Sequence, residues 1–399
     1  MTIYRQRQQL LQVELLKRGW SGFLVTHHVD IYYYCGSMQT GYLFIPAEGE
    51  ALYLVRRSLI RASEEAFADV QSLGSWKTLA ERLRARSANG SAANGSAADA
   101  PLRIATELDV LPVQLYSKLQ TALPGAVWED GSLLVREQRM IKSPDEVTAI
   151  REAARIVDAA LEAVIPLVRE GMAEFELMAL IEHQLRLRGH QGLMRMRAYN
   201  SELITGMVAA GASAAVPTYF DGPAGGTGLH PSSPQSSGRA LIRRGEPILV
   251  DIGCMTDGYL IDQTRTLVIG DLDPELQKAY DAAEAVLRAT EARLQPGAIA
   301  EHLYLLALDQ VQEAGLSDHF MGYGADQVKF LGHGIGLEID ELPVLAKGFK
   351  YPLAPGMVIA IEPKFTFPGR GVVGIEDTYL ITDTGWEKLT VSRGGLIRV

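Results

Sequence analysis

The chain has 399 residues, of which 47% are hydrophobic and 22% charged, the proportions of an ordinary globular protein. This length is too great for one typical core, so two domains are expected. The net charge of −10 argues against nucleic acid as a partner. Two cysteines give no disulfide framework, and the sequence has neither a signal peptide nor an apolar stretch of membrane-spanning length. We therefore expect a cytoplasmic protein without membrane contact.

The first part of the chain alternates between helical and strand patterns. Apolar residues recur at helical spacing over 3–19, where Gly19 supplies a stop signal. Residues rich in β-branched and aromatic side chains predict strands, separated later by helical patterns, at 21–26, 41–46, 50–55 and 102–105. This region is predicted to be an α/β domain. Within it, residues 87–100 repeat Asn-Gly-Ser-Ala-Ala, which predicts a flexible surface excursion that cannot contribute to a core.

A helix start marks the second domain, and we place the boundary at residue 142. Ser143 is an N-cap candidate, Pro144 fits the first helical position, and Glu146 completes a capping box. A second helix is predicted over 173–188.

A long loop follows at 221–238. Loops of this length inside a compact domain are usually functional or disordered. This loop directly precedes a strand-rich segment and contains His230.

Residues 248–266 predict a β-hairpin with two carboxylates on one face. The arms are rich in β-branched and aromatic residues around Thr256-Asp257-Gly258. A Thr256-Asp257 loop pairs Asp251 with Asp262, whereas an Asp257-Gly258 loop pairs Asp262 with Gly253. Because side chains alternate with period two, both registers place Asp251 and Asp262 on the same face. A dry site would hold them with a cation or a shared proton, and a divalent metal is the simplest answer.

A second hairpin, formed by 357–363 and 371–380, sets Glu362 opposite Glu376 when the pairing is centred on Gly369. Between the two hairpins, His333 lies in the glycine-rich segment 330–338. Four carboxylates and one imidazole suit a pair of Mn, Fe, Co or Zn ions better than one tetrahedral structural zinc.

These residues stand in a recognisable order of local motifs. The motifs are Asp262-Gln263-Thr264-Arg265-Thr266, Gly332-His333-Gly334-Ile335-Gly336, Ile361-Glu362-Pro363 and Ile375-Glu376-Asp377-Thr378. In this order the chain resembles the creatinase/aminopeptidase P/prolidase/methionine aminopeptidase superfamily of metallopeptidases. The resemblance implies a creatinase-type α/β N-terminal domain over 1–142 and a "pita-bread" α+β catalytic domain over 143–399.

The resemblance also implies a site and an activity. Asp251, Asp262, His333, Glu362 and Glu376 would hold two divalent ions with a bridging water or hydroxide, and Glu362 would act as general base. The expected activity is that of an Xaa-Pro aminopeptidase or prolidase-like peptidase on small peptides. A homodimer is expected on the same ground.

Two departures from the family pattern concern the substrate side. Peptidase members carry a second histidine seven residues after the metal histidine, where this chain has Asp340. An ionised aspartate donates no hydrogen bond, and losing one oxyanion donor costs about 2.7–4 kcal/mol in the barrier. Lys329 and His230 are the nearest candidates to compensate. The resemblance implies a substrate-contacting histidine in the loop before Asp251, for which His230 is the candidate, and a solvated loop position for it stays open. Aminopeptidase P and prolidase also have an arginine two residues before the last metal glutamate, where this chain has Gly374.

Three functions therefore remain open. The first is an Xaa-Pro metallopeptidase. The second is a metal-dependent non-peptidase on the same fold, a C–N hydrolase or lyase acting on a small zwitterionic molecule. The third is a binding module without catalytic activity, which fits less well because all five ligand residues are present.

Overall fold

The computed structural model describes residues 2–91, 101–200 and 202–399. The chain separates into two compact units, Met1–Gln138 and Arg139–Val399. The boundary placed from the sequence at residue 142 lies at the start of the second unit. Within the described residues, no helix combines the length and the apolar character that a membrane span requires.

The first unit is an α/β domain built on one mixed sheet of six strands. The strands in spatial order are β4 (Asp69–Ser72), β3 (Leu52–Val55), β2 (Gly41–Pro46), β1 (Gly22–Val25), β5 (Arg103–Thr106) and β6 (Val127–Asp130). β1 pairs antiparallel with β2 and parallel with β5. The predicted strands are thus present.

The described part of this unit has six helices around the sheet: α1 (Ile3–Arg18), α2 (His28–Cys35), α3 (Leu59–Glu65), α4 (Trp76–Ser91), α5 (Val113–Ala122) and α6 (Ser132–Arg139). α1 ends as predicted, because Gly19 adopts the left-handed conformation and its N–H bonds to the carbonyls of the last turn. α4 continues to Ser91, so the first residues of the predicted flexible excursion at 87–100 are helical instead. Residues 92–100 of that excursion lie outside the described residues.

The second unit is an α+β domain with three sheets. The four-stranded sheet contains, in order, β17 (Ile397–Arg398), β9 (Tyr259–Val268), β8 (Pro247–Thr256) and β7 (Gly206–Ala210). The five-stranded sheet contains β11 (Glu341–Ala346), β10 (Phe330–Gly334), β12 (Val358–Ile361), β15 (Asp377–Ile381) and β16 (Trp386–Lys388). A third sheet pairs β13 (Lys364–Phe367) with β14 (Gly371–Gly374).

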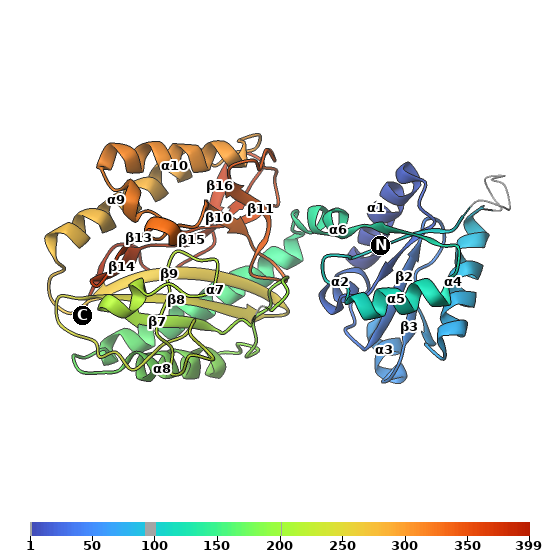
Figure 1. Cartoon of the computed structure of the whole chain (residues 1–399), viewed down its shortest axis with the longest axis horizontal. Helices are drawn as coiled ribbons and strands as arrows, with labels where there is room; N and C mark the ends of the chain where they lie inside the picture. The colour runs from blue at the N-terminus through green and yellow to red at the C-terminus, as the bar shows by residue number, and fades with distance from the viewer. Residues whose placement is uncertain (1, 92–100, 201) are drawn as a thin grey trace. The chain divides into compact units, whose positions relative to one another are not determined.

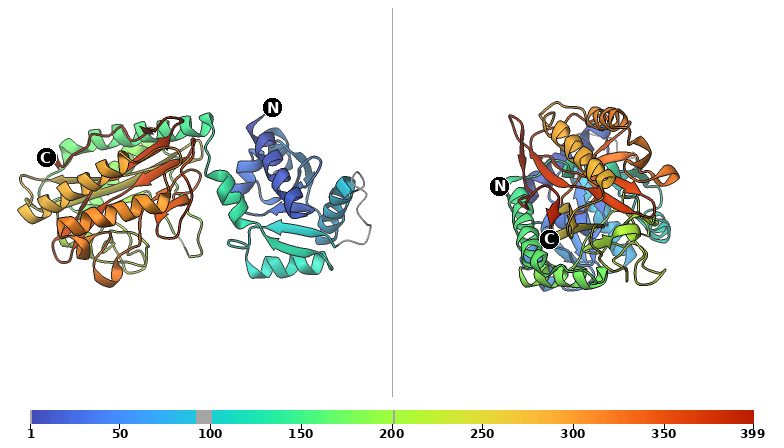
Figure 2. Two further views of the ribbon diagram at one scale, coloured as in Figure 1. Left: turned by 90° about the horizontal axis from the view of Figure 1, so that it is seen from above. Right: turned by 90° about the vertical axis from the view of Figure 1, so that its left-hand side faces the viewer.

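Long helices lie outside these sheets (Figure 1). α7 (Pro144–Val164) and α8 (Glu174–Leu187) pack on one side of the four-stranded sheet, and α9 (Pro274–Glu291) and α10 (Ala300–Ala314) lie side by side beyond the other strands (Figure 2). α7 begins at the predicted capping box. Short 3₁₀ turns complete the unit at Ile165–Leu167, Gly211–Ala215, Ser317–His319 and Gly324–Asp326. The fold class predicted from the sequence is therefore confirmed.

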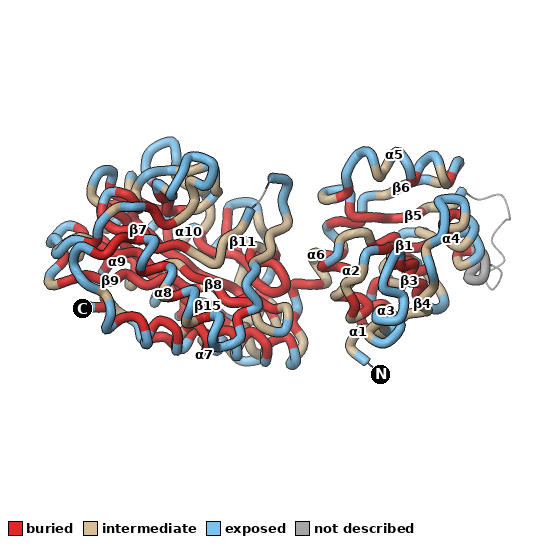
Figure 3. The backbone as a smooth tube through the Cα atoms, turned by 90° about the horizontal axis from the view of Figure 1, so that it is seen from below, coloured by how far each residue is buried: buried red, intermediate tan, exposed pale blue. Residues whose placement is uncertain are grey.

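The main core fills the space between α9, α10 and the strands of the second unit. The long strands β8 and β9 are buried along most of their length (Figure 3). In these two strands the partly exposed residues are Asp251, Thr256 and Asp262. Thr256 adjoins the exposed turn of the hairpin, whereas the two aspartates lie within the strands, so they mark the place where the interior opens.

A buried ionic cluster holds the loop between β10 and β11. Glu341 is 5% exposed and accepts hydrogen bonds from Arg139, from Lys142 at 3.0 Å and from the Leu337 N–H at 2.9 Å. Arg139 also pairs with Glu338 at 2.8 Å. Burial would raise the pKa of Glu341, but the positive charges of Arg139 and Lys142 lower it to about 2. The cluster fixes the loop that follows His333.

We expect Glu341→Gln to lower the free energy of unfolding of the second unit by roughly 3 kcal/mol at pH 7. The depressed pKa means that this contribution is complete above the ordinary glutamate pKa and decreases as the pH falls toward 2. Urea titrations of both proteins at pH 7 and pH 3.5 measure the difference. If the difference in the free energy of unfolding between the two proteins is as large at pH 3.5 as at pH 7, the role given to the Glu341 carboxylate is contradicted.

Candidate metal centre

The β8–β9 hairpin places Asp251 and Asp262 on one face. Thr256 pairs with Tyr259, so the loop is Asp257-Gly258, and Asp262 lies opposite Gly253. Both loop residues have positive φ, 49° and 85°, which a two-residue hairpin turn of this kind requires. The sequence left two registers open, and the structure has the second.

Glu362 and Glu376 face each other at the junction of two sheets. On one side of the pair Ile361 lies opposite Asp377, and on the other Lys364 lies opposite Gly374. The two glutamates therefore stand in the predicted register, between β12 and β13 and between β14 and β15. β10 pairs with β12 and brings His333 opposite Ala360.

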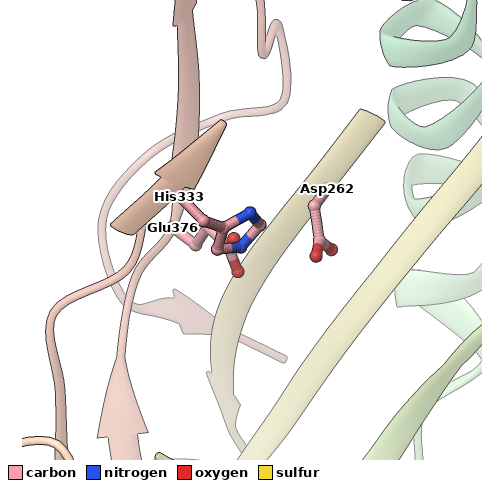
Figure 4. A group of neighbouring side chains, drawn as sticks. All are labelled: Asp262, His333 and Glu376. Carbon is pink, nitrogen blue, oxygen red and sulfur yellow. The ribbon is translucent and has the colours of Figure 1, made fainter. Parts of the chain in front are cut away.

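Asp262, His333 and Glu376 form a group whose ligand atoms lie within 4.8 Å of one another. Figure 4 shows these three side chains around a common space, Asp262 from β9 and His333 from β10. Glu376 Oε2 accepts a hydrogen bond from Thr264 Oγ1 at 2.8 Å, but the buried Oε1 atom has no donor among the described residues. An orphaned carboxylate oxygen beside an imidazole and a second carboxylate is a donor set that fits one divalent ion.

The other half of the cluster contains a buried lysine. Lys364 is 1% exposed, and its Nζ lies 2.6 Å from Glu362 Oε2, 3.1 Å from Asp251 Oδ2 and 3.3 Å from Glu376 Oε2. The three N–H groups of the ammonium thus match three carboxylates from different parts of the chain. The sequence reasoning missed Lys364. The available signal was the two-residue spacing from Glu362, which places both side chains on one face of an extended strand.

The crowding of acids shows in their pKa values. Burial, together with the charges of Glu376 and Asp251, raises the pKa of Asp262 well above its usual range. Burial also raises the pKa values of Asp251, Glu362 and Glu376, although Lys364 opposes the increase in each. Burial would lower the pKa of Lys364, but the same carboxylates raise it well above its usual value. The site therefore favours the binding of a cation among its carboxylates.

Asp340 orients His333. The His333 Nδ1 atom lies 3.0 Å from the Gly334 carbonyl oxygen and 3.3 Å from Asp340 Oδ1. Two acceptors at Nδ1 favour the tautomer that carries its proton there, which leaves the lone pair on Nε2. Nε2 lies 3.6 Å from Glu362 Oε1, on the side of the acids. Asp340 is thus placed to position the histidine, and it donates no hydrogen bond.

Arg265 fixes the backbone around Glu376. Its side chain is fully buried and donates to the carbonyl oxygens of Thr264 and Glu376 at 2.8 and 2.7 Å, and to Asp377 Oδ1 at 2.7 Å. The Thr378 hydroxyl donates to the Asp262 carbonyl oxygen at 2.9 Å. The motifs around Asp262 and Glu376 therefore join the four-stranded and five-stranded sheets at the ligand positions.

One cavity of about 100 Å³ receives the cluster. All five predicted ligand residues and Asp340 line it, as do Asp221, Pro223 and Gln235 from the long loop. His230 does not line it. That side chain is exposed and bonds through Nδ1 to Ser232 at 2.9 Å, and Lys329 is exposed outside the cavity wall as well. The 221–238 loop thus reaches the site through Asp221, Pro223 and Gln235 and not through His230.

Comparison with known proteins agrees with this architecture. The model of metallopeptidase family M24 matches residues 148–383, and that of the creatinase/prolidase N-terminal domain matches residues 7–141. The chain belongs to metallopeptidase family M24. The superfamily resemblance seen in the sequence motifs is thereby confirmed.

Related M24 proteins cover nearly the whole chain. An Xaa-Pro dipeptidase of Pyrococcus furiosus is 29% identical over 372 residues, which is 92% of this chain and 93% of that protein. The structure of an Xaa-Pro dipeptidase from Bacillus anthracis is 27% identical and superimposes with a TM-score of 0.81, covering 99% of this chain and all of that one. The prolidase structure from Pyrococcus horikoshii OT3 shares the fold with a TM-score of 0.81 at 24% identity, over 98% and 100% of the two chains.

For this M24 protein we expect Asp340→Asn to weaken divalent-metal binding by about tenfold, the lower end of the range for a partner of a metal histidine. The lower end applies because the Gly334 carbonyl still accepts from Nδ1. Competition with a fluorescent chelator measures the dissociation constant. An unchanged constant would show that Asp340 does not act through His333.

Proposed function

We propose that this M24 protein is a metal-dependent hydrolase of small peptides with Xaa-Pro specificity. The observation that carries the proposal is the convergence of Asp262, His333 and Glu376, with Glu362 beside them, in one cavity of an M24 catalytic unit. The non-catalytic binding module considered from the sequence is not supported by these groups, because together they can bind a catalytic metal ion.

The roles of the residues follow from their positions. Asp262, His333 and Glu376 would hold a divalent ion, which supplies a Lewis acid for a carbonyl oxygen and lowers the pKa of a bound water. Glu362 Oε1 lies 3.6 Å from His333 Nε2 at the cavity, and we assign to Glu362 the transfer of a proton from the attacking water to the leaving nitrogen. Asp340 keeps the His333 lone pair directed at the site.

The cavity wall also indicates which end of a substrate it receives. Beyond the ligand cluster its acidic residues are Glu202, Asp221 and Asp340, and the residues described there include no lysine or arginine. Such a wall attracts the protonated α-amine of a peptide. It offers no cation to a carboxylate one residue beyond the scissile bond, in keeping with Gly374 at the position of the family arginine.

A second candidate is the metal-dependent non-peptidase, a C–N hydrolase or lyase of a small zwitterion. The specific observation in its favour is Asp340. This residue is engaged with His333 and donates no hydrogen bond where peptidase members have a histidine, so an oxyanion on the substrate lacks that donor.

The purified chain is stripped of metal and reloaded with Mn²⁺, Co²⁺ or Zn²⁺. We expect it to release amino acids from a panel of Xaa-Pro dipeptides and tripeptides. Asp262→Asn removes a ligand charge and serves as the control, in which turnover falls at least about 100-fold. Amino-acid release is followed by chromatography. Turnover that is equal in the variant, or absent in a metal-loaded wild type, would contradict the peptidase proposal.

We further expect a dipeptide amide, Xaa-Pro-NH₂, to be hydrolysed with a kcat/KM about tenfold higher than the free acid Xaa-Pro. The reason is that the described wall has no cation to compensate the desolvated carboxylate, and one unpaired charge contact is worth about 1.4 kcal/mol or more. Parallel initial-rate measurements on the two substrates give the ratio. A preference for the free acid would show that a cation reaches the site by another route.

A further inference from the structure

We propose that the Lys364 ammonium takes the place of one of the two divalent ions, so that this chain holds a single ion, at Asp262, His333 and Glu376. The inference deepens the proposed function and rests on it, but it concerns the composition of the site and is tested without an activity assay.

The first argument is occupancy. Lys364 Nζ lies between Glu362, Asp251 and Glu376 at 2.6, 3.1 and 3.3 Å. All three belong to the five residues that the resemblance assigns to the pair of ions. An ion bound by the same oxygens needs ligand distances of about 2.0–2.2 Å. The ammonium nitrogen stands among those oxygens, so the space cannot hold both cations.

The second argument is that the chain around Lys364 is built to accept it. Lys364 lies directly opposite Gly374 in the β13–β14 pair. A Cβ atom at position 374 would lie 2.5 Å from the Pro363 carbonyl oxygen and 2.7 Å from Lys364 Cγ. A larger side chain there is incompatible with this path of the lysine. Position 374 therefore admits glycine because backbone atoms of Pro363 and Lys364, together with the stem of the lysine side chain, lie against it.

The third argument is charge. The four carboxylates, when ionised, carry four negative charges in a largely buried site. Lys364 compensates one of them and a single divalent ion compensates two, which leaves one negative charge. A second divalent ion added to the lysine would make the cluster net positive and would bring a cation against an ammonium that is 1% exposed.

Asp262, His333 and Glu376 can still bind a metal ion beside the lysine. Glu376 divides its two oxygens between the halves of the site, because Oε2 accepts from Lys364 and Thr264, whereas Oε1 has no donor among the described residues. Among the described residues, Lys364 forms its ion pairs with Asp251, Glu362 and Glu376, and not with Asp262 or His333. The lysine thus fills one half and leaves the other half open.

The test is the number of ions per chain. The full chain is stripped with a chelator, reloaded with Mn²⁺, freed of excess ion by gel filtration and analysed by inductively coupled plasma mass spectrometry. We expect about one Mn²⁺ per wild-type chain and about two per chain of Lys364→Ala, because the alanine opens the space among the three carboxylates. Lys347→Ala, which removes an exposed lysine, is the matched control and should stay at one.

Two or no ions in the wild type would overturn the proposal, as would one ion in both the wild type and Lys364→Ala. The wild-type count does not depend on the folding of the variant. Electron paramagnetic resonance gives an independent reading, since Mn²⁺ ions about 3.5–4 Å apart couple and an isolated ion does not. An uncoupled spectrum is expected for the wild type and a coupled one for Lys364→Ala.

This result and the peptide assay can fail separately. One ion per chain without peptide turnover would keep the composition of the site and remove the peptidase function. Two ions per chain with peptide turnover would keep the peptidase function and remove the single-ion composition of the site.

Discussion

Four carboxylates are brought together where two hairpins meet, and most of the surrounding structure can be understood as the means of holding them there. Burial raises the pKa values of Asp262 and Glu376, and the repulsion between like charges at this spacing raises them further. One buried cation contacts these acids directly, and others hold the chain around them. Lys364 lies among the acids themselves, and Arg265 fixes the backbone on which Glu376 stands. Further out, Arg139 and Lys142 hold Glu341 and so the loop that follows His333.

The same constraint explains which parts of the site could be predicted from the sequence. The period-two alternation of strands fixed the face of Asp251 and Asp262 in either register, and the turn at Gly369 fixed the opposition of Glu362 and Glu376. These are local properties of one hairpin each. The choice between the two registers of the first hairpin depended on the positive φ angles of Asp257 and Gly258, which the sequence favoured without deciding.

What the sequence could not supply were contacts between distant elements. Lys364 shares a strand face with Glu362, but a lysine is almost always exposed, and only the convergence of three segments makes its burial favourable. His230 is the histidine of the long loop, yet the loop reaches the cavity through Asp221, Pro223 and Gln235. Lys329 was considered for its nearness in sequence to His333 and is exposed.

The two departures from the family pattern also acquire a physical meaning. Gly374 lies opposite Lys364, where a Cβ atom would meet the Pro363 carbonyl oxygen and the stem of the lysine, and Asp340 accepts from the imidazole that would ligate the ion. On our proposal both positions bear on the metal centre as well as on the substrate side. On this account the M24 fold retains a carboxylate cluster of familiar form, in which a protein ammonium replaces one of its cations.

The most direct test of this account is a crystal structure of the metal-loaded chain, with anomalous scattering recorded at the absorption edge of the bound metal. We expect one anomalous peak per chain, within about 2.0–2.2 Å of ligand atoms of Asp262, His333 and Glu376, with Lys364 Nζ still among Asp251, Glu362 and Glu376. Two peaks about 3.5–4 Å apart, with the lysine side chain displaced, would contradict it.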